Sequence, residues 1–405
     1  MKCFCWFYVF LLFRFVFAET GGGSPSPESS GILRVQAELI AFPAERVELM
    51  ERKQMAPLSS RQFVELAQQQ VGRTLEKHTW FARLGEYAPS SESDSYLYPI
   101  RMEKAPENPG QLKEVAHEER QLGFQLRARL NSTQPGGSAI LTLIGDKAYR
   151  LEPSLSEWPH LNRMTPSFRF WTLLASVSLP YHEAVVITES SARNAHERIV
   201  LLLKVAPGEN TIKRSSTEGD EQIVHPEALT EHPGLLIGVH LRLLRIDADL
   251  VTELEAKAGH RFRTKDVLEL WREGHMQTEW VQRVKTLNGE NAIVDMGEEH
   301  IFPTHVELDE ELPFPLFSDF EIQNSGWSLN VTPVFYNGRL DLKLMGTWTE
   351  RFPDMNGNPL HPRFSRREIS SSFSAKPGNN LLIGHSTSPD RTQRWYWLLY
   401  TELER

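Results

Sequence analysis

The second half of the chain repeats the pattern of the first half. A shift of 204 positions aligns the sequence with itself over a long stretch without a gap, and the identities include Val35 with Val239, Leu39 with Leu243, Ala44 with Ala248, Glu65 with Glu269, Gly85 with Gly289 and Pro99 with Pro303. Later matches need slightly different shifts, as in Gly123 with Gly326, Leu141 with Leu342 and Ser178 with Ser374. Chance matches would not keep the same shift without a gap over such a long stretch. The sequence therefore predicts a tandem duplication, which limits the chain to one architecture used twice.

Length and composition allow two domains of ordinary size. The chain has 405 residues, of which 40% are hydrophobic and 24% are charged, so each half can bury a core of its own. A polar stretch separates the halves. We expect a first repeat over residues 32–206, a linker over 207–233 and a second repeat over 234–405.

The N-terminal segment has the pattern of a secretory signal peptide. Lys2 supplies a positive start, an apolar run extends from Cys3 through Phe13, and Val16-Phe17-Ala18 forms a cleavage site. The apolar run is too short for a permanent membrane-spanning helix; an uncleaved membrane anchor is the competing interpretation. We expect a signal peptide over residues 1–18 and a flexible linker over 19–31, and therefore an exported protein.

Cysteine content and charge exclude several functions. Both cysteines, Cys3 and Cys5, lie in the leader, so the processed chain can form no disulfide, thiolate nucleophile or cysteine metal site. The formal net charge is -9 and becomes -11 when Lys2 and Arg14 leave with the signal peptide. An acidic chain without a concentrated basic stripe argues against nucleic acid as a partner.

Each half opens with a strand followed by a helix. Apolar residues alternate with polar ones at Leu33, Val35, Ala37 and Leu39, and again at Ile237, Val239, Leu241 and Leu243. Ser59-Ser60-Arg61-Gln62 predicts a capping box, and apolar residues follow at helical spacing at Phe63, Val64, Ala67, Val71 and Leu75. In the second half we expect Thr264 to be the N-cap. Each helix is expected to pack on its own sheet, with a partner-binding groove as the alternative.

The rest of each half predicts short strands joined by turns. Asn288-Gly289 stands between two strand-like runs and predicts a hairpin in which both turn residues have positive φ. In the final strand, Trp395, Trp397 and Leu399 alternate with Tyr396 and Leu398, so both faces are expected to be covered. The predicted fold class is α+β, with two homologous strand-rich domains, each a mainly antiparallel sheet with one or two packed helices.

The order of elements in the second half resembles the C-terminal domain of bacterial secretins, the outer-membrane ring proteins of type II and type III secretion and type IV pilus systems. A threonine-leucine-asparagine-glycine turn is followed by a glycine-x-x-leucine-x-valine-x-proline strand and a late glycine-rich turn. The residues that match are Thr286, Gly289, Gly326, Leu329, Val331, Pro333, Gly378 and Gly384. The first half carries a faded version of the pattern. The resemblance implies a secretin-like fold present as a diverged tandem duplication.

Departures from the secretin pattern weaken the inference of a conducting channel. The closing motif rich in proline and glycine is missing after Gly384, and neither half has room for the separate N-terminal periplasmic modules. An alternating, aromatic-bordered hairpin that could face a membrane is also missing between Leu340 and Ser370.

Residue types that could carry chemistry do not form a convincing site. His300 and His305 lie five positions apart on a predicted strand and should point to opposite faces. His117 and His196 lack the second histidine of a metallopeptidase helix. Asp354–Asn358 lacks the glycine and glutamate spacing of a calcium loop, and the acidic run of Glu307, Asp309, Glu310 and Glu311 is typical of a solvated loop. We predict no catalytic, cofactor-binding or metal-binding residues and no cofactor.

The expected function is that of a non-enzymatic, exported envelope protein in the periplasm or outer membrane of a Gram-negative-type bacterium. It would act through contacts with other envelope or secretion-system proteins, or with copies of itself, in a secretion or pilus-type assembly. Membrane association is compatible with this function, although the mature chain has no predicted transmembrane helix. An exported enzyme or ligand-binding protein with a site between the two domains is one alternative, and a true outer-membrane secretin pore is another.

Overall fold

The computed structural model describes residues 32–89, 94–105, 107–134, 137–151, 165–191, 196–208, 234–307, 315–352, 362–388 and 391–404. All of them belong to one compact unit that combines Gly31–Gly208 with Thr230–Arg405. The predicted signal peptide, the linker over 19–31, nearly all of the linker over 207–233, the Asp354–Asn358 segment and the acids Asp309, Glu310 and Glu311 lie outside the described residues.

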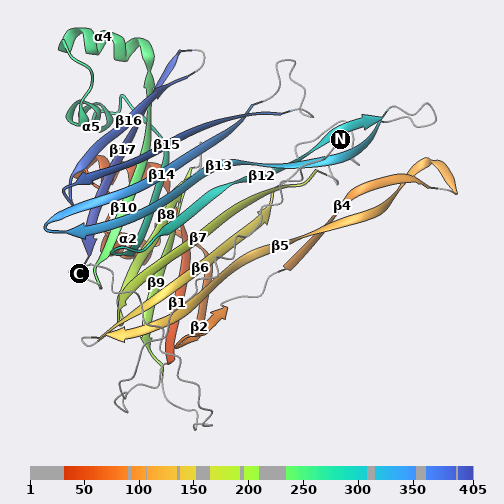
Figure 1. Cartoon of the computed structure of the whole chain (residues 1–405), viewed down its shortest axis with the longest axis horizontal. Coiled ribbons are helices and arrows are strands. Elements are labelled where there is room, and N and C mark those ends of the chain that lie inside the picture. Colours follow the sequence, from red (N-terminus) through yellow and green to blue (C-terminus); the bar gives the residue numbers. More distant parts are fainter. Residues whose placement is uncertain are drawn as a thin grey trace. The chain divides into compact units, whose positions relative to one another are not determined.

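The described part of each half begins with a strand and two helices and continues with strands alone (Figure 1). The first half contains β1 (Ile32–Pro43), α1 (Ala44–Gln54), α2 (Ser60–Gln68), β2 (Arg73–Arg83), β3 (Tyr87–Pro89), β4 (Asp94–Ala105), β5 (Asn108–Gln134), β6 (Ser138–Arg150), β7 (Ser167–Pro180), β8 (Ala184–Ser191) and β9 (Glu197–Pro207). The second half contains β10 (Leu236–Asp247), α4 (Ala248–Ala258), α5 (Thr264–Arg272), β11 (Gln277–Leu287), β12 (Ala292–Glu307), β13 (Leu316–Tyr336), β14 (Arg339–Phe352), β15 (Arg363–Ala375), β16 (Asn380–Thr387) and β17 (Gln393–Glu404).

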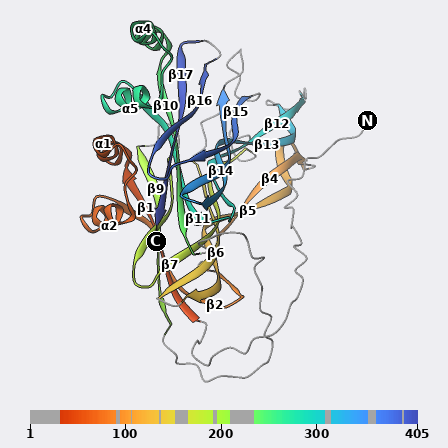
Figure 2. The ribbon, with the colours of Figure 1, turned by 60° about the vertical axis from the view of Figure 1, so that its left-hand side comes forward.

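The strands form two sheets, and both sheets contain strands from both halves. Sheet A has the order β16-β17-β10-β11-β8-β9-β1-β2, and sheet B has the order β15-β14-β13-β12-β7-β6-β5-β3, with β4 also paired to β5. Helices α1, α2, α4 and α5 lie along one side of sheet A (Figure 2). The strand-rich α+β fold with antiparallel sheets is therefore confirmed.

The two halves use the same strand register. Val35 pairs with Trp80 in the first half, and the corresponding pair in the second half is Val239 with Val284. The ladder shifts register after Leu39 in one half and at the matching place, after Leu243, in the other. Sheet B also repeats its register. Gly123 pairs with Ala148 in the first half, and the matching glycine, Gly326, pairs with Thr349 in the second half. Strand order and register thus repeat at the shifts that align the sequence with itself.

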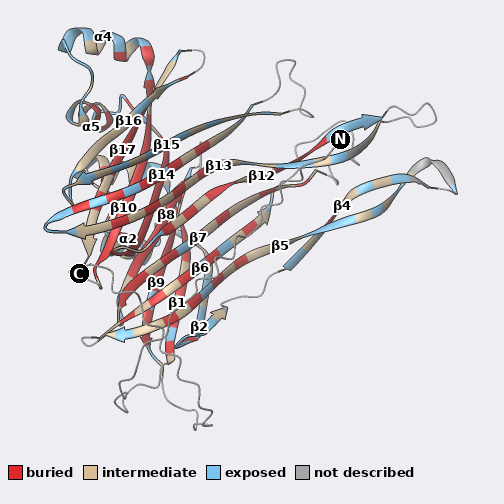
Figure 3. Ribbon diagram, viewed as in Figure 1, coloured by how far each residue is buried: buried red, intermediate tan, exposed pale blue. Residues whose placement is uncertain are grey.

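The halves share one core, so the expectation that each half closes its own core is wrong. Strand β11 pairs with β8 in sheet A and β12 pairs with β7 in sheet B, which makes both sheets continuous across the junction. The buried cluster between the sheets combines residues of both halves (Figure 3). Within it the Trp327 ring stacks on Trp280 at 4.2 Å and on Trp348 at 4.8 Å between centroids.

The final strand β17 is covered on both faces, as predicted. Trp395 and Trp397 belong to the core between the sheets, whereas Tyr396 and Leu398 belong to the smaller cluster beneath α4 and α5. All four side chains are buried.

The helices confirm one predicted cap and correct another. Ser59 and Gln62 form the predicted capping box, in which the Ser59 N–H donates to Gln62 Oε1 at 2.8 Å. Helix α2 ends at Gln68, however, so Val71 and Leu75 lie beyond it, and Leu75 is part of β2. Helix α5 has Arg263, not Thr264, at its N-cap. The Thr264 hydroxyl instead accepts from the Leu382 N–H at 3.1 Å and ties the helix to β16.

The turn at Asn288-Gly289 is not a hairpin. Strand β11 before it belongs to sheet A and β12 after it belongs to sheet B, so the chain crosses between sheets here. Only Gly289 has positive φ, at 85°. The Asn288 side chain exchanges hydrogen bonds with the backbone of Phe335, and the Gly289 N–H donates to Pro333 O at 2.7 Å. These contacts to β13 hold the corner and replace the ladder bonds of a hairpin.

Candidate protein interface

The junction between the halves is formed by the pairing of strand edges in both sheets. In sheet A, residues 281–284 of β11 pair with residues 188–191 of β8, and Arg283 stands opposite Glu189. In sheet B, residues 293–300 of β12 pair with residues 167–174 of β7. We call these two pairings, with the side chains that meet across them, the inner seam.

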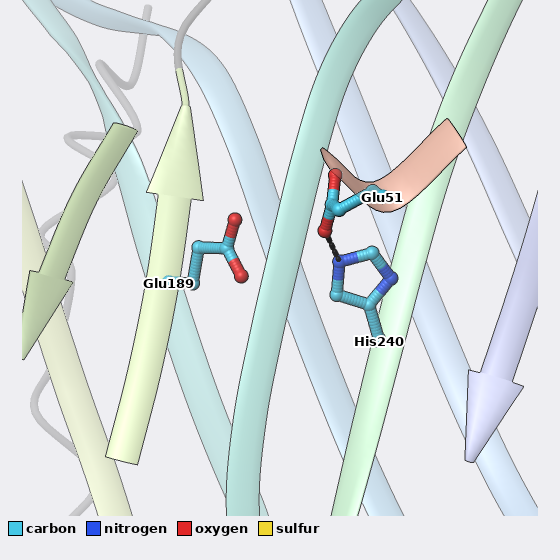
Figure 4. Close-up of side chains that lie close together, drawn as sticks. All are labelled: Glu51, Glu189 and His240. Carbon is cyan, nitrogen blue, oxygen red and sulfur yellow. Dashed lines mark ion pairs between the residues drawn. The ribbon is translucent and has the colours of Figure 1, made fainter. Parts of the chain in front are cut away.

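Buried charges cluster on the helix side of the inner seam. Glu51, near the end of α1, accepts from Arg242 of β10 at 2.8 Å and lies 3.0 Å from Arg198 of β9. Arg198 donates to Glu189 of β8 at 2.6 Å. Each of these four residues is at most 2% exposed. Figure 4 shows that Glu51 comes from a helix, whereas Glu189 and His240 come from separate strands. The cluster joins α1, β8 and β9 of the first half to β10 of the second.

Burial and mutual attraction set the charge states in this cluster. Burial alone would lower the pKa of Arg198, but the neighbouring carboxylates Glu51 and Glu189 outweigh it and raise that pKa. Burial, with a smaller contribution from Glu51, raises the pKa of Glu189 against the opposing effect of Arg198. Burial and the nearby guanidinium groups lower the pKa of His240 well below its ordinary value, so the imidazole is neutral.

The same cluster contains a geometric arrangement that resembles a metal site. Glu51, Glu189 and His240 each present a ligand atom, and these atoms lie within 4.8 Å of one another. The carboxylate oxygens already contact Arg198 and Arg242. A divalent cation would add positive charge beside these guanidinium groups. The donor set therefore fits an ion-pair network and does not fit a resident metal.

The segment of the first half from α1 to α2 also contacts the second half at and next to β11. Arg283 of β11 donates to the Leu58 carbonyl at 2.6 Å, and Lys285 donates to Ser60 Oγ at 2.9 Å. Arg52 of α1 donates to the Met276 carbonyl at 3.0 Å. The first half thus covers the helix-side face of β10 and β11. That cover explains why Arg242 and His240, which alternate with apolar residues in the sequence, are buried.

Lys285 gives the inner seam a measurable pH dependence. Burial and Arg283 lower the pKa of Lys285 to about 8, so between pH 8 and the unfolded value of about 10.4 the unfolded chain holds a proton that the folded chain has released. Stability should therefore rise with pH in that window. We expect the free energy of unfolding of the natural chain, relative to Lys285→Met, to increase by about 2 kcal/mol between pH 7.5 and pH 10. Urea unfolding of both proteins measures the difference, and parallel pH profiles would contradict it.

The outer edges of both sheets have no partner strand among the described residues. Sheet A ends at β2 on one side and β16 on the other. Sheet B ends at β15 and at the β3 and β4 strands. Unpaired strand edges present free N–H and C=O groups and are the usual place where another chain adds a strand. These edges are the candidate interface.

The residues of the secretin-like pattern do not form one site. Thr286, Gly289 and Pro333 meet near the corner between the sheets, where Thr286 is buried and donates to the Ser176 carbonyl at 3.2 Å. Leu329 and Val331 are core residues of β13. The three other glycines lie apart: Gly326 faces β12, Gly378 is in the turn before β16, and Gly384 lies in β16. Their positions indicate structural roles.

The histidines and acids that the sequence offered stay separate where they are described. His300 is buried, contacts Ser325 Oγ at 2.7 Å and has its pKa lowered to about 4 by burial and Arg351. His305 is exposed, and its Nε2 atom lies 3.2 Å from Glu307 Oε1. A hollow of about 820 Å³ lies between β4 and β5 of the first half and β12 and β13 of the second, with the acidic side chains Glu103, Glu118, Glu307 and Asp319 in its lining.

Among the described residues, no helix has both the length and the apolar character needed to cross a membrane.

No protein family model matches the chain, and no curated protein sequence matches it. Three solved structures that resemble it are secretins. The type II secretin GspD from enteropathogenic Escherichia coli is 10% identical over 42% of this chain and 66% of that chain, with a TM-score of 0.22. The V. cholerae type IV competence pilus secretin PilQ is 12% identical over 55% of this chain and 70% of that chain, with a TM-score of 0.24.

The third structure is the Salmonella SPI-1 type III secretion injectisome secretin InvG, which is 11% identical over 68% of this chain and 89% of that chain, with a TM-score of 0.24. The chain spans slightly less than two thirds of the GspD structure. All three belong to the family that the order of motifs resembles. Superpositions with such low TM-scores carry no argument about function, which must come from the residues of this chain.

Proposed function

We propose that the protein is a non-enzymatic, exported component of a secretion or pilus-type assembly in a bacterial envelope, and that it acts through protein contacts at its sheet edges. The observation that carries this proposal is the inner seam, where one strand-rich half binds another through edge pairing. Open edges remain at both ends of both sheets in the described chain. Its two halves are joined by the pairing of strand edges, and its described sheets end in unpaired strands. Such a protein is suited to binding further strand-rich proteins.

The repeated strand register supports a tandem duplication as the origin of the two halves. We propose that residues 32–206 and 234–405 descend from one secretin-like domain, with residues 1–18 as a signal peptide that directs export to the periplasm or outer membrane. The eight motif residues then have a structural role, which the core positions of Leu329 and Val331 and the positive φ of Gly289 and Gly378 support. Secretion and pilus proteins are the proposed partners.

Expression of the full chain in a Gram-negative host tests the proposal. We expect the protein in the envelope fraction, shortened at its N-terminus, and light scattering of the purified protein should give a mass of several chains. Single chains at every concentration, together with recovery of the uncut protein in the cytoplasm, would contradict the proposed function.

A further inference from the structure

The two open edges of sheet A correspond to the two edges that meet in the inner seam. Strand β2 of the first half matches β11, because both pair with the opening strand of their half in the same register. Strand β16 of the second half matches β8, because each pairs with the strand that follows it and has a register shift at the same place. Inside the chain β11 pairs with β8. Their counterparts β2 and β16 have no partner strand among the described residues.

Residues at matching places are buried at the inner seam and exposed at the open edge. Lys285 of β11 is 0% exposed, whereas Phe81, at the same place in β2, is 56% exposed. Arg283 is buried, whereas Thr79 at its place is exposed. At the inner seam the cover comes from α1 and α2 of the other half. An exposed aromatic side chain beside an unpaired strand indicates that a similar cover is missing.

Given an assembly of several chains as proposed above, we infer that β2 of one chain pairs with β16 of a second copy in the register of the inner seam. The pairs Arg283 with Glu189 and Val281 with Ser191 then become Thr79 with His385 and Lys77 with Thr387. Helices α4 and α5 of the second copy cover Phe81, as α1 and α2 cover Lys285. Because the two edges differ, the contact is head-to-tail, so the complex either closes into a ring or keeps a free β2 at one end and a free β16 at the other.

The charges at this contact between chains differ from those of the inner seam. Glu255 takes the place of Glu51 and lies 3.0 Å from Arg394, which takes the place of Arg198. The incoming chain brings Glu38 of β1 to the place of Arg242, with Lys77 Nζ of β2 3.5 Å from its carboxylate. A carboxylate thus approaches Glu255 where the inner seam has a guanidinium group. The contact between chains lacks a counterpart of the buried pair between Arg242 and Glu51, so it is looser than the inner seam.

Cysteines placed on β2 and β16 test whether a second copy of the chain is the partner and whether Thr79 stands opposite His385. The full chain with Cys3→Ser and Cys5→Ser has no other cysteine. With Thr79→Cys and His385→Cys added, mild oxidation should link chains in series and give a ladder on a non-reducing gel. The matched control, Thr79→Cys with Thr387→Cys, moves one partner two positions along the same strand and should give less than about a tenth of the linked product, because disulfide geometry is narrow.

Each outcome separates this inference from the proposed function. Complexes that form without preferential linking of Thr79→Cys to His385→Cys would overturn the inference and leave the proposed function standing. Linked pairs from Thr79→Cys alone would show a two-fold contact through β2 and would also overturn it. Single chains under all conditions would overturn the inference, and they would contradict the proposed function as well if the protein also stayed uncut in the cytoplasm.

A charge reversal tests the chemistry of the contact. Glu38→Arg restores the arrangement of Arg242 beside Glu51 and should tighten association about tenfold, measured by sedimentation over a range of protein concentrations. Glu45→Arg makes the same charge change at an exposed position of α1 and should leave association unchanged. Equal effects of the two variants would show that net charge, and not the contact of Glu38 with Glu255, controls association.

Discussion

Replacement of Glu51 by glutamine should cost about 3–5 kcal/mol of unfolding free energy, because it leaves the buried Arg198 and Arg242 with too little negative charge. Glutamine keeps the size of the side chain and some of its hydrogen bonds. The lost unfolding free energy therefore measures the contribution of the negative charge. Urea unfolding followed by circular dichroism measures it. Glu51 and the two arginines are at most 2% exposed, so water cannot solvate the guanidinium groups in place of the carboxylate.

Glu255→Gln is the matched control for this prediction. Glu255 occupies the equivalent place in α4 and pairs with Arg394 at 3.0 Å, but both side chains are about one fifth exposed. Its loss should cost about 1 kcal/mol or less. Equal costs for Glu51→Gln and Glu255→Gln would mean that the inner seam does not depend on its buried charges.

Gly326→Ala should destabilise the protein by about 4 kcal/mol. Gly326 has a φ of 125°, and a Cβ atom there would lie 2.3 Å from Met296 O and 2.4 Å from Gly297 Cα. Both neighbours are backbone atoms of β12, so no side-chain rotation relieves the overlap. The two strands would have to separate where Gly297 and Gly326 pair. Thermal and urea unfolding check the loss.

Gly338→Ala separates the overlap from the effect of backbone conformation alone. Gly338 has a φ of 75° in the turn between β13 and β14, and a Cβ atom there would meet nothing within 4 Å. Its replacement should cost only about 1–2 kcal/mol, the ordinary penalty of a left-handed conformation. A loss at Gly326 no larger than the loss at Gly338 would contradict the close approach of β12 and β13.

The periodic parts of the fold could be predicted from the sequence because they depend on local pattern. Alternation at Leu33 to Leu39 and at Trp395 to Leu399 identified strands, and Ser59 with Gln62 identified a helix start. Turn chemistry was less reliable. Asn337 and Gly338 both have positive φ and form a true two-residue hairpin, whereas the same dipeptide at Asn288-Gly289 marks a crossing between sheets. The dipeptide alone does not say which sheet the next strand joins.

The seam could not be predicted because its contacts are remote in sequence. Glu51 and Arg242 are 191 positions apart, and nothing near either residue indicates the other. Comparison of the halves offered one signal that was missed: Lys285 and Arg242 stand where the first half has Phe81 and Glu38. Such a difference at equivalent places marks the positions where the two copies have different neighbours.

Electron microscopy of the assembled protein tests the central claim most directly, namely that the chain extends by repeating the contact between its own halves. We predict a head-to-tail array in which every inner chain contacts two others through opposite edges, and in which the repeating unit at low resolution is one half of the chain. A particle of two chains related by a two-fold axis, or isolated chains at high concentration, would contradict this account.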